Sequence, residues 1–124
     1  MNTNVIEAKR YIANAKDILR EKAIKEDGYY QDKKYIRMAG NTAYSGILEA
    51  LDAVIIEKQK GRKSVNWYKE QLSKTDKKVL NAFVSAYDIL HLSLGYDGIP
   101  DVSIAKIGLE RAEYIIDWVE KRTA

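Results

Sequence analysis

The chain has 124 residues, of which 46% are hydrophobic and 31% are charged. This length and composition are typical of an ordinary soluble globular protein, so we expect a single domain over residues 1–124. The absence of cysteine excludes disulfides, thiol nucleophiles and cysteine-ligated metals, and the net charge of +3 is too small to indicate a class of partner by itself.

The first segment is predicted to be a helix that runs from Asn4 to Ile24. Its apolar residues recur at alternating steps of three and four, which is the spacing of one buried helical face. These residues are Val5, Ala8, Ile12, Ala15 and Leu19. Gly28 then interrupts the chain, and no alternation typical of a strand follows it.

A second helix is predicted from Tyr35 to near Lys58, with Asp32 as its N-cap. This segment is apolar over most of its circumference, because its polar residues fall on one narrow stripe. The stripe contains Asn41, Thr42, Ser45, Glu49 and Asp52. A helix of this kind is normally surrounded by other helices. We therefore expect the second helix to be among the most buried.

Two further helices are predicted before the only proline. Ser64 is expected to cap a short helix over Val65–Leu72. The spacing in Ser73-Lys-Thr-Asp76 resembles a capping box and starts a fourth helix that extends to about Leu94. This fourth helix is also expected to be well covered.

The segment from Gly95 to Asp101 contains two glycines and the proline and predicts a turn. A fifth helix follows from Val102 or Ser103 to Lys121. Because no segment shows the period of a strand, the sequence predicts an all-α fold. The expected architecture is an antiparallel bundle of four long helices plus one short helix.

His91 is the only histidine and is therefore the first candidate for a chemical or binding role. It falls at the edge of the apolar face of the fourth helix beside Tyr87, and Asp88 is placed three residues earlier, where it is able to hold the ring. Acid–base catalysis needs a second group and a cleft, which the sequence does not identify. We predict a partly buried structural histidine, with Tyr87, Asp88 and His91 as candidate binding residues.

A dinuclear metal centre needs two carboxylate-x-x-His steps, and this chain has one histidine. We therefore predict no metal site and no cofactor. Arg111 falls between Ile107 and Ile115 in the apolar arc of the fifth helix. Either its stem packs while its head reaches solvent, or its guanidinium forms an ion pair in a pocket or interface.

A basic cluster surrounds Gly61 and is a candidate contact for an anionic partner. It contains Lys58, Lys60, Arg62 and Lys63. Trp67 and Tyr68 follow, and aromatic rings beside basic residues are able to stack on single-stranded nucleic acid. No nucleic-acid-binding motif accompanies them, and the last helix carries an acidic stripe. Since tyrosine is common at protein interfaces, we favour a protein interface and expect nucleic acid not to be a partner.

Three stretches carry a resemblance to known proteins: YIANAKDIL at residues 11–19, YIRMAGNTAYSGIL at 35–48 and YDILHLSLGY at 87–96. They resemble a family of small uncharacterised bacterial five-helix-bundle proteins over nearly the entire chain. More distantly, the chain resembles HEPN-type domains and the helical partners of small nucleotidyltransferases. This resemblance implies a four- or five-helix bundle, often dimeric, with RNA cleavage in some members.

The nuclease members of the HEPN type carry an Arg separated from a His by four to six residues. Anchored on His91, that Arg would stand at position 84, 85 or 86, where this chain has Val84, Ser85 and Ala86. The resemblance therefore implies the fold without the activity.

The preferred interpretation is a non-catalytic binding module for a protein partner or a nucleotide-like ligand, and its biological role is unknown. The alternative is a HEPN-type RNA-processing enzyme or toxin with an unconventional site. A homodimer built partly on tyrosine-rich surface is predicted, because few helices are available to cover the second one. The charged first ten residues lack a secretory apolar region, and no apolar run approaches the roughly 20 residues of a membrane span. We therefore expect a cytoplasmic protein.

Overall fold

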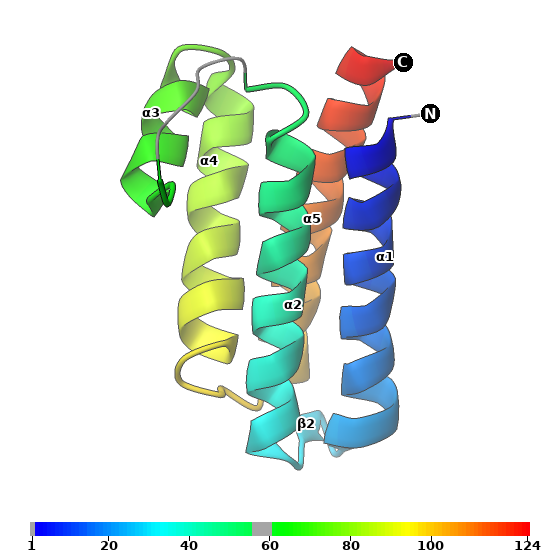
Figure 1. Ribbon diagram of the computed structural model, residues 1–124. Helices are drawn as coiled ribbons and strands as arrows, with labels where there is room; N and C mark the ends of the chain where they lie inside the picture. Colours follow the sequence, from blue (N-terminus) through cyan, green and yellow to red (C-terminus); the bar gives the residue numbers. More distant parts are fainter. Residues whose placement is uncertain (1, 56–60) are drawn as a thin grey trace.

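The four long helices run alternately up and down in the computed structural model, which describes residues 2–55 and 61–124, and the short third helix lies beside the fourth (Figure 1). The all-α prediction is confirmed. The first and fourth helices each end in a wider π-helical segment, which is η1 after α1 and η2 after α4. The elements in chain order are α1 (Thr3–Ile18), η1 (Leu19–Ala23), β1 (Lys25–Glu26), β2 (Tyr29–Tyr30), α2 (Lys33–Leu51), α3 (Val65–Ser73), α4 (Lys77–Ala86), η2 (Tyr87–Leu94) and α5 (Val102–Thr123).

The helix starts follow from polar side chains that accept backbone N–H groups. Asp32 caps α2 and Ser64 caps α3, as predicted. The fourth helix differs, because the Asp76 carboxylate accepts the Val79 N–H at 3.0 Å. The Ser73 hydroxyl instead donates to a carbonyl oxygen of α3 at 2.6 Å. The predicted capping box at Ser73 is therefore wrong, and the cap is Asp76.

Helix α2 ends at Leu51, earlier than its predicted end near Lys58, a residue that lies outside the described ranges. Backbone N–H groups of Ala53 and Val54 bond only three residues back, which tightens the chain into a turn. The side chain of Asp52 accepts the Tyr68 hydroxyl at 2.8 Å and the Lys63 ammonium at 3.0 Å. These contacts fix the turn against α3.

A small hairpin connects the first two helices, so the prediction that the chain forms no strand is wrong. Strands β1 and β2 pair antiparallel around Asp27 and Gly28, whose φ angles are 52° and 84°. Two consecutive positive φ angles define a type I′ turn, for which Asp-Gly is a favoured sequence. The hairpin also bonds to the start of α5. The Tyr30 N–H donates to the Pro100 carbonyl at 2.8 Å, and the Val102 N–H donates to the Gly28 carbonyl at 3.1 Å.

The core lies around α2, which contributes eight buried residues. In Figure 1 this helix stands between α1 and α4, with α5 behind it. Two of its glycines permit close approach. A Cβ on Gly46 would lie 2.8 Å from the Tyr11 Cβ of α1, and a Cβ on Gly40 would lie 2.5 Å from the Leu90 carbonyl oxygen of η2. The helices of one chain thus cover the apolar side of α2. The homodimer prediction can therefore no longer be argued from an uncovered side of this helix.

No helix in the described part of the chain has the length and apolar character needed to cross a membrane.

Candidate functional site

Three aromatic rings meet where α2 faces η2. The His91 ring centroid lies 4.9 Å from that of Tyr44 and 5.3 Å from that of Tyr87, and the two tyrosine centroids are 5.7 Å apart. We call Tyr44, Tyr87 and His91 the aromatic cluster. All three side chains are half-buried. The Phe83 ring, 6.2 Å from that of Tyr44, connects the cluster to the core.

The π-helical geometry of η2 determines which side chains join the cluster. Its hydrogen bonds close at i→i+5, as in the 2.9 Å bond from the Gly95 N–H to the Leu90 carbonyl oxygen. Tyr87 and His91 are four residues apart and lie on the same side, as they would in an α-helix, whereas the wider turn separates residues three apart. Asp88, three residues before His91, is exposed and does not hold the ring. Single π-helical segments are frequent at functional sites.

The aromatic cluster has one buried polar atom without a partner and one phenol that burial keeps protonated. The His91 Nδ1 atom is buried and has no hydrogen-bond partner among the residues that the structure describes. Burial, with a smaller contribution from the neighbouring Tyr87, raises the pKa of Tyr44 to about 12. The Tyr44 phenol therefore stays protonated near neutral pH and remains a hydrogen-bond donor.

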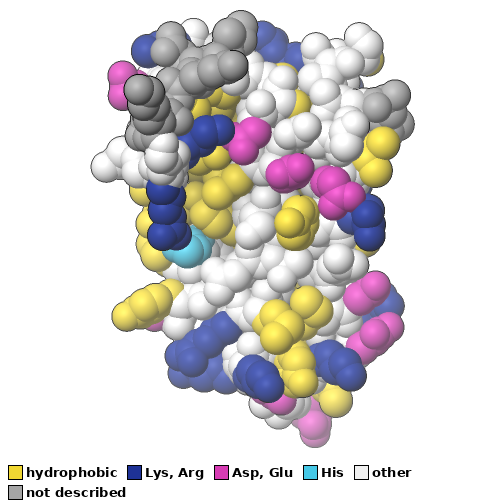
Figure 2. All heavy atoms as spheres, in the orientation of Figure 1, with side chains coloured by type: hydrophobic (Ala, Val, Ile, Leu, Met, Phe, Trp, Pro, Cys, Tyr) yellow, Lys and Arg dark blue, Asp and Glu magenta, His cyan; other side chains and the backbone are white. Residues whose placement is uncertain are grey.

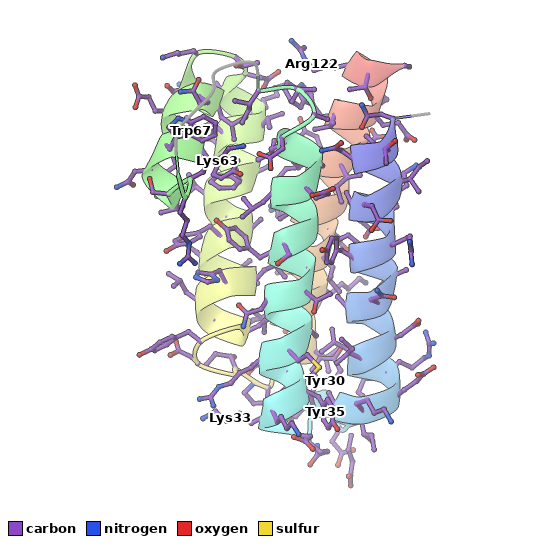
Figure 3. The ribbon with its side chains drawn as sticks, in the orientation of Figure 1. Tyr30, Lys33, Tyr35, Lys63, Trp67 and Arg122 are labelled. Carbon is purple, nitrogen blue, oxygen red and sulfur yellow. The ribbon has the colours of Figure 1, made fainter. Side chains whose placement is uncertain are left out.

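Two lysines lie over aromatic rings at this face, but only one is free of a carboxylate. The Lys63 Nζ lies 5.3 Å from the Trp67 ring centroid and 3.0 Å from the Asp52 carboxylate, so its charge is already compensated. In Figure 3 the Lys63 and Trp67 side chains lie next to each other on the α3 side of the bundle. The Lys69 Nζ lies 5.6 Å from the Tyr87 ring centroid, and within residues 2–55 and 61–124 it forms no salt bridge.

The surface around the cluster is apolar. Figure 2 shows hydrophobic side chains set back between α2 and the α3–α4 side, with basic side chains along the border and the single histidine at the lower end. An apolar wall with a few convergent polar groups is the usual composition of a binding site. The arrangement suits a flat group that stacks on a ring and carries a negative charge.

The structure brings together two of the predicted binding residues, Tyr87 and His91. Arg111 is exposed and lies elsewhere, on a hollow of about 420 Å³ between α4 and α5. The other residues that line this hollow are Lys78, Asn81, Ala82, Ser85 and Tyr114. The exposed position of Arg111 agrees with a head group that reaches solvent. No ion pair of Arg111 is found in the described ranges.

Of the predicted basic cluster, Lys58 and Lys60 lie outside the described residues, and Arg62 is exposed. Lys63 lies over the Trp67 ring and pairs with Asp52. Two residues of the site were not predicted, Tyr44 and Lys69. The amphipathic pattern placed Tyr44 in the core, and nothing in the sequence shows that it faces Tyr87.

No group of three or more His, Asp or Glu side chains comes together as a metal site in the ranges that the structure describes.

Comparison with known proteins identifies a family and a similar solved structure. The family described as "Domain of unknown function (DUF5618)" matches residues 3–121. A solved structure of a protein of unknown function from Dyadobacter fermentans is 62% identical in sequence, and its TM-score is 0.92. The similarity covers 96% of this chain and 95% of that one. No curated protein matches the chain.

Proposed function

The chain belongs to the family described as Domain of unknown function (DUF5618), and from the geometry we propose that it is a non-catalytic binding module for a nucleotide-like ligand. The observation that carries this proposal is the Lys69 ammonium, which forms no salt bridge with any residue that the structure describes and lies beside the half-buried rings of the aromatic cluster. A base stacks on an exposed ring face, and a phosphate pairs with Lys69. The Tyr44 hydroxyl donates a hydrogen bond to an acceptor on the ligand.

The charge distribution supports a single anionic group in the ligand. Lys63 is compensated by Asp52, whereas Lys69 has no carboxylate partner among the described residues and is available for a phosphate. A cation beside a ring and a stacking surface are together the elements that recognise a base with its phosphate. A protein partner, which the sequence left open, is the other occupant that the test below distinguishes.

The alternative, RNA cleavage of HEPN type, has less support. Such a site depends on a paired Arg and His that stabilise charge on the phosphate, and loss of that stabilisation costs orders of magnitude in rate. Val84, Ser85 and Ala86 occupy the positions of the Arg, and Arg111 belongs to the α4–α5 hollow instead of the cluster. The proposal retains the HEPN-like relationship as a similarity of fold. It also retains the predictions of a homodimer and of a cytoplasmic location.

The test is calorimetric titration with AMP, adenosine and ribose 5-phosphate. We expect AMP to bind more tightly than either fragment, because only AMP supplies both the ring and the charge. Lys69→Ala should weaken AMP binding by roughly ten- to a hundredfold, since a charge-assisted hydrogen bond contributes about 1.5–3 kcal/mol. Lys74→Ala is the matched control, because Lys74 directly follows α3 and pairs with Glu70 at 3.8 Å.

No binding of AMP at millimolar concentration would contradict the proposal, as would an equal loss in the two lysine variants. Incubation of the purified protein with RNA tests the alternative. We expect no cleavage, and we expect His91→Ala to change stability only. Cleavage that disappears in a folded His91→Ala protein would establish the enzyme instead.

A further inference from the structure

The two sides of helix α5 differ in charge. On the side that faces α1, basic and acidic residues pair across the helices, as in the 2.6 Å contact between the Lys9 ammonium and the Glu120 carboxylate. On the side that faces α4, the α4–α5 hollow is lined by Lys78 and Arg111, and none of its lining residues in the described part of the chain is acidic. Neither of these two cations forms a salt bridge with a residue in the described ranges. The hollow therefore collects two positive charges.

The sequences of α4 and α5 explain why these two cations have no carboxylate beside them. Salt bridges along a helix join residues three or four positions apart. Around Lys78 those positions hold lysine, threonine, asparagine and alanine, and around Arg111 they hold glycine, tyrosine and two isoleucines. Two like charges that share one hollow repel each other, and a bound anion removes that repulsion. The arrangement thus favours an anion from solution.

The rest of the lining is uncharged and suits a ligand with hydroxyl groups. The Asn81 amide and the hydroxyls of Ser85 and Tyr114 line the hollow, and each is able both to donate and to accept a hydrogen bond. The Tyr114 side chain, which is 46% exposed, and the buried Ala82 add a small apolar surface. The volume of about 420 Å³ lies in the range of roughly 300–1,000 Å³ that is usual for small-molecule sites.

We propose that the α4–α5 hollow binds the phosphate monoester of a small hydroxylated molecule, such as a sugar phosphate. A phosphate monoester carries about −1.5 to −2 charges near neutral pH and has three strong acceptor oxygens, so it matches two cations. The planar guanidinium of Arg111 pairs with two phosphate oxygens, and the Lys78 ammonium supplies a second charge. Asn81, Ser85 and Tyr114 then hydrogen-bond to the hydroxyl groups of the ligand.

The charge of the hollow selects this class over other anions. A carboxylate, a sulfate ester or a single phosphodiester carries one negative charge and leaves one of the two cations uncompensated. The site is also separate from the aromatic cluster, which lies where α2 faces η2. This inference therefore does not rest on the proposed nucleotide binding, and the two fail separately.

The test is calorimetric titration at about pH 7.5 with glucose 6-phosphate, glucose 6-sulfate and glucose, which share one sugar and differ in charge. We expect glucose 6-phosphate to bind, glucose 6-sulfate to bind more weakly, and glucose to show no binding at millimolar concentration. No binding of glucose 6-phosphate at that concentration would overturn the proposal. Equal binding of the sulfate would also overturn it, because the hollow would then accept any anion.

Variants locate the bound phosphate. Lys78→Gln and Arg111→Gln should each weaken glucose 6-phosphate binding about tenfold, since each removes a charge-assisted hydrogen bond. Lys77→Gln and Lys106→Gln are the matched controls, because these exposed lysines stand on α4 and α5 outside the hollow and the substitution removes the same charge. Lys69→Ala, which tests the aromatic cluster, should leave this binding unchanged.

The pattern across the variants decides between a site and general attraction to a basic surface. Equal losses in the control variants, or a loss in Lys69→Ala, would overturn the assignment to the hollow. Far-ultraviolet circular dichroism checks that every variant remains helical, and the exposed positions of Lys78 and Arg111 leave the core intact. Ribose 5-phosphate bound in the hollow is recognised in the same way, because its binding weakens in Arg111→Gln and persists in Lys69→Ala.

Discussion

Tyr44 illustrates how one side chain carries both packing and chemistry. Its ring contacts Phe83 on the core side and His91 on the surface side, while burial raises the pKa of its phenol to about 12. The folded state therefore holds this proton more tightly than the unfolded chain, in which the pKa is near 10. The stabilisation is fully present below pH 10 and is lost as the pH rises toward 12.

The raised pKa of Tyr44 in the folded state predicts how stability changes at high pH. The free energy of unfolding should fall between about pH 9 and about pH 11.5, and it should fall less in Tyr44→Phe, which has no phenol to ionise. Urea unfolding of both proteins at the two pH values measures the difference. Burial also raises the pKa of Tyr68, so part of the decrease should remain. An identical decrease in both proteins would contradict the assignment to Tyr44.

At the level of single residues, the sequence predicted positions but not partners. Helical spacing placed His91 beside Tyr87, and both belong to the site. It also offered Asp88 as a support for the histidine, because an α-helix brings residues three apart together, whereas η2 is a π-helix. The contact between Tyr44 and His91 depends on how α2 meets η2, which is a property of the packed molecule.

Among the elements, the hairpin depends on its Asp-Gly turn. Gly28 has a φ of 84°, and a Cβ there would meet no atom within 4 Å, so the cost of a side chain is purely conformational. Gly28→Ala should lower the free energy of unfolding by about 1 kcal/mol. Gly28→Asn should lose less, since Asn adopts the left-handed conformation more readily. Urea unfolding of the two variants measures this order, and equal losses would contradict it.

The contact between α2 and η2 depends on Gly40. Replacing a helical glycine by alanine normally stabilises a helix by up to about 1 kcal/mol. Here the added Cβ would lie 2.5 Å from the Leu90 carbonyl oxygen and 2.8 Å from the Gly95 nitrogen, which are backbone atoms that do not move independently. Gly40→Ala should therefore lower the free energy of unfolding, by about 1–3 kcal/mol.

Gly108 on α5 is the control for that substitution. A Cβ there would approach the side-chain ends of Ile89, at 2.6 Å, and Leu90, at 2.8 Å, and such ends are able to rotate away. Gly108→Ala should therefore cost less than Gly40→Ala in thermal unfolding. The opposite order would show that the α2–η2 contact is more adaptable than its geometry indicates.

The helices were predictable because their signals are local. Apolar periodicity found all five, and Asp32 and Ser64 marked two starts correctly. The end of α2 was missed because a contact between Asp52 and Tyr68, distant in the sequence, ends it. The hairpin was missed although Asp27-Gly28 is a recognised turn signal, because its strands are only two residues long.

For the molecule as a whole, α2 is the element that the other helices enclose. Ile47 is 0% exposed, and its replacement by alanine leaves a cavity that the surrounding helices fill only in part. Ile47→Ala should cost about 2–5 kcal/mol, a large share of the roughly 5–15 kcal/mol typical of a domain. Ile6→Ala, at a position on α1 that is 44% exposed, should cost less than about 1 kcal/mol. Denaturant midpoints compare the two, and similar costs would contradict the central place of α2.

The bonds between the hairpin and the start of α5 also affect the kinetics of folding. They join residues 28–30 to residues 100–102, so they form only when the two halves of the chain have already docked. A contact made late contributes little to the folding transition state. Loosening this junction through Gly28→Ala should accelerate unfolding and leave the folding rate nearly unchanged. The hairpin then slows unfolding, which lengthens the lifetime of the folded bundle, and it does not speed folding.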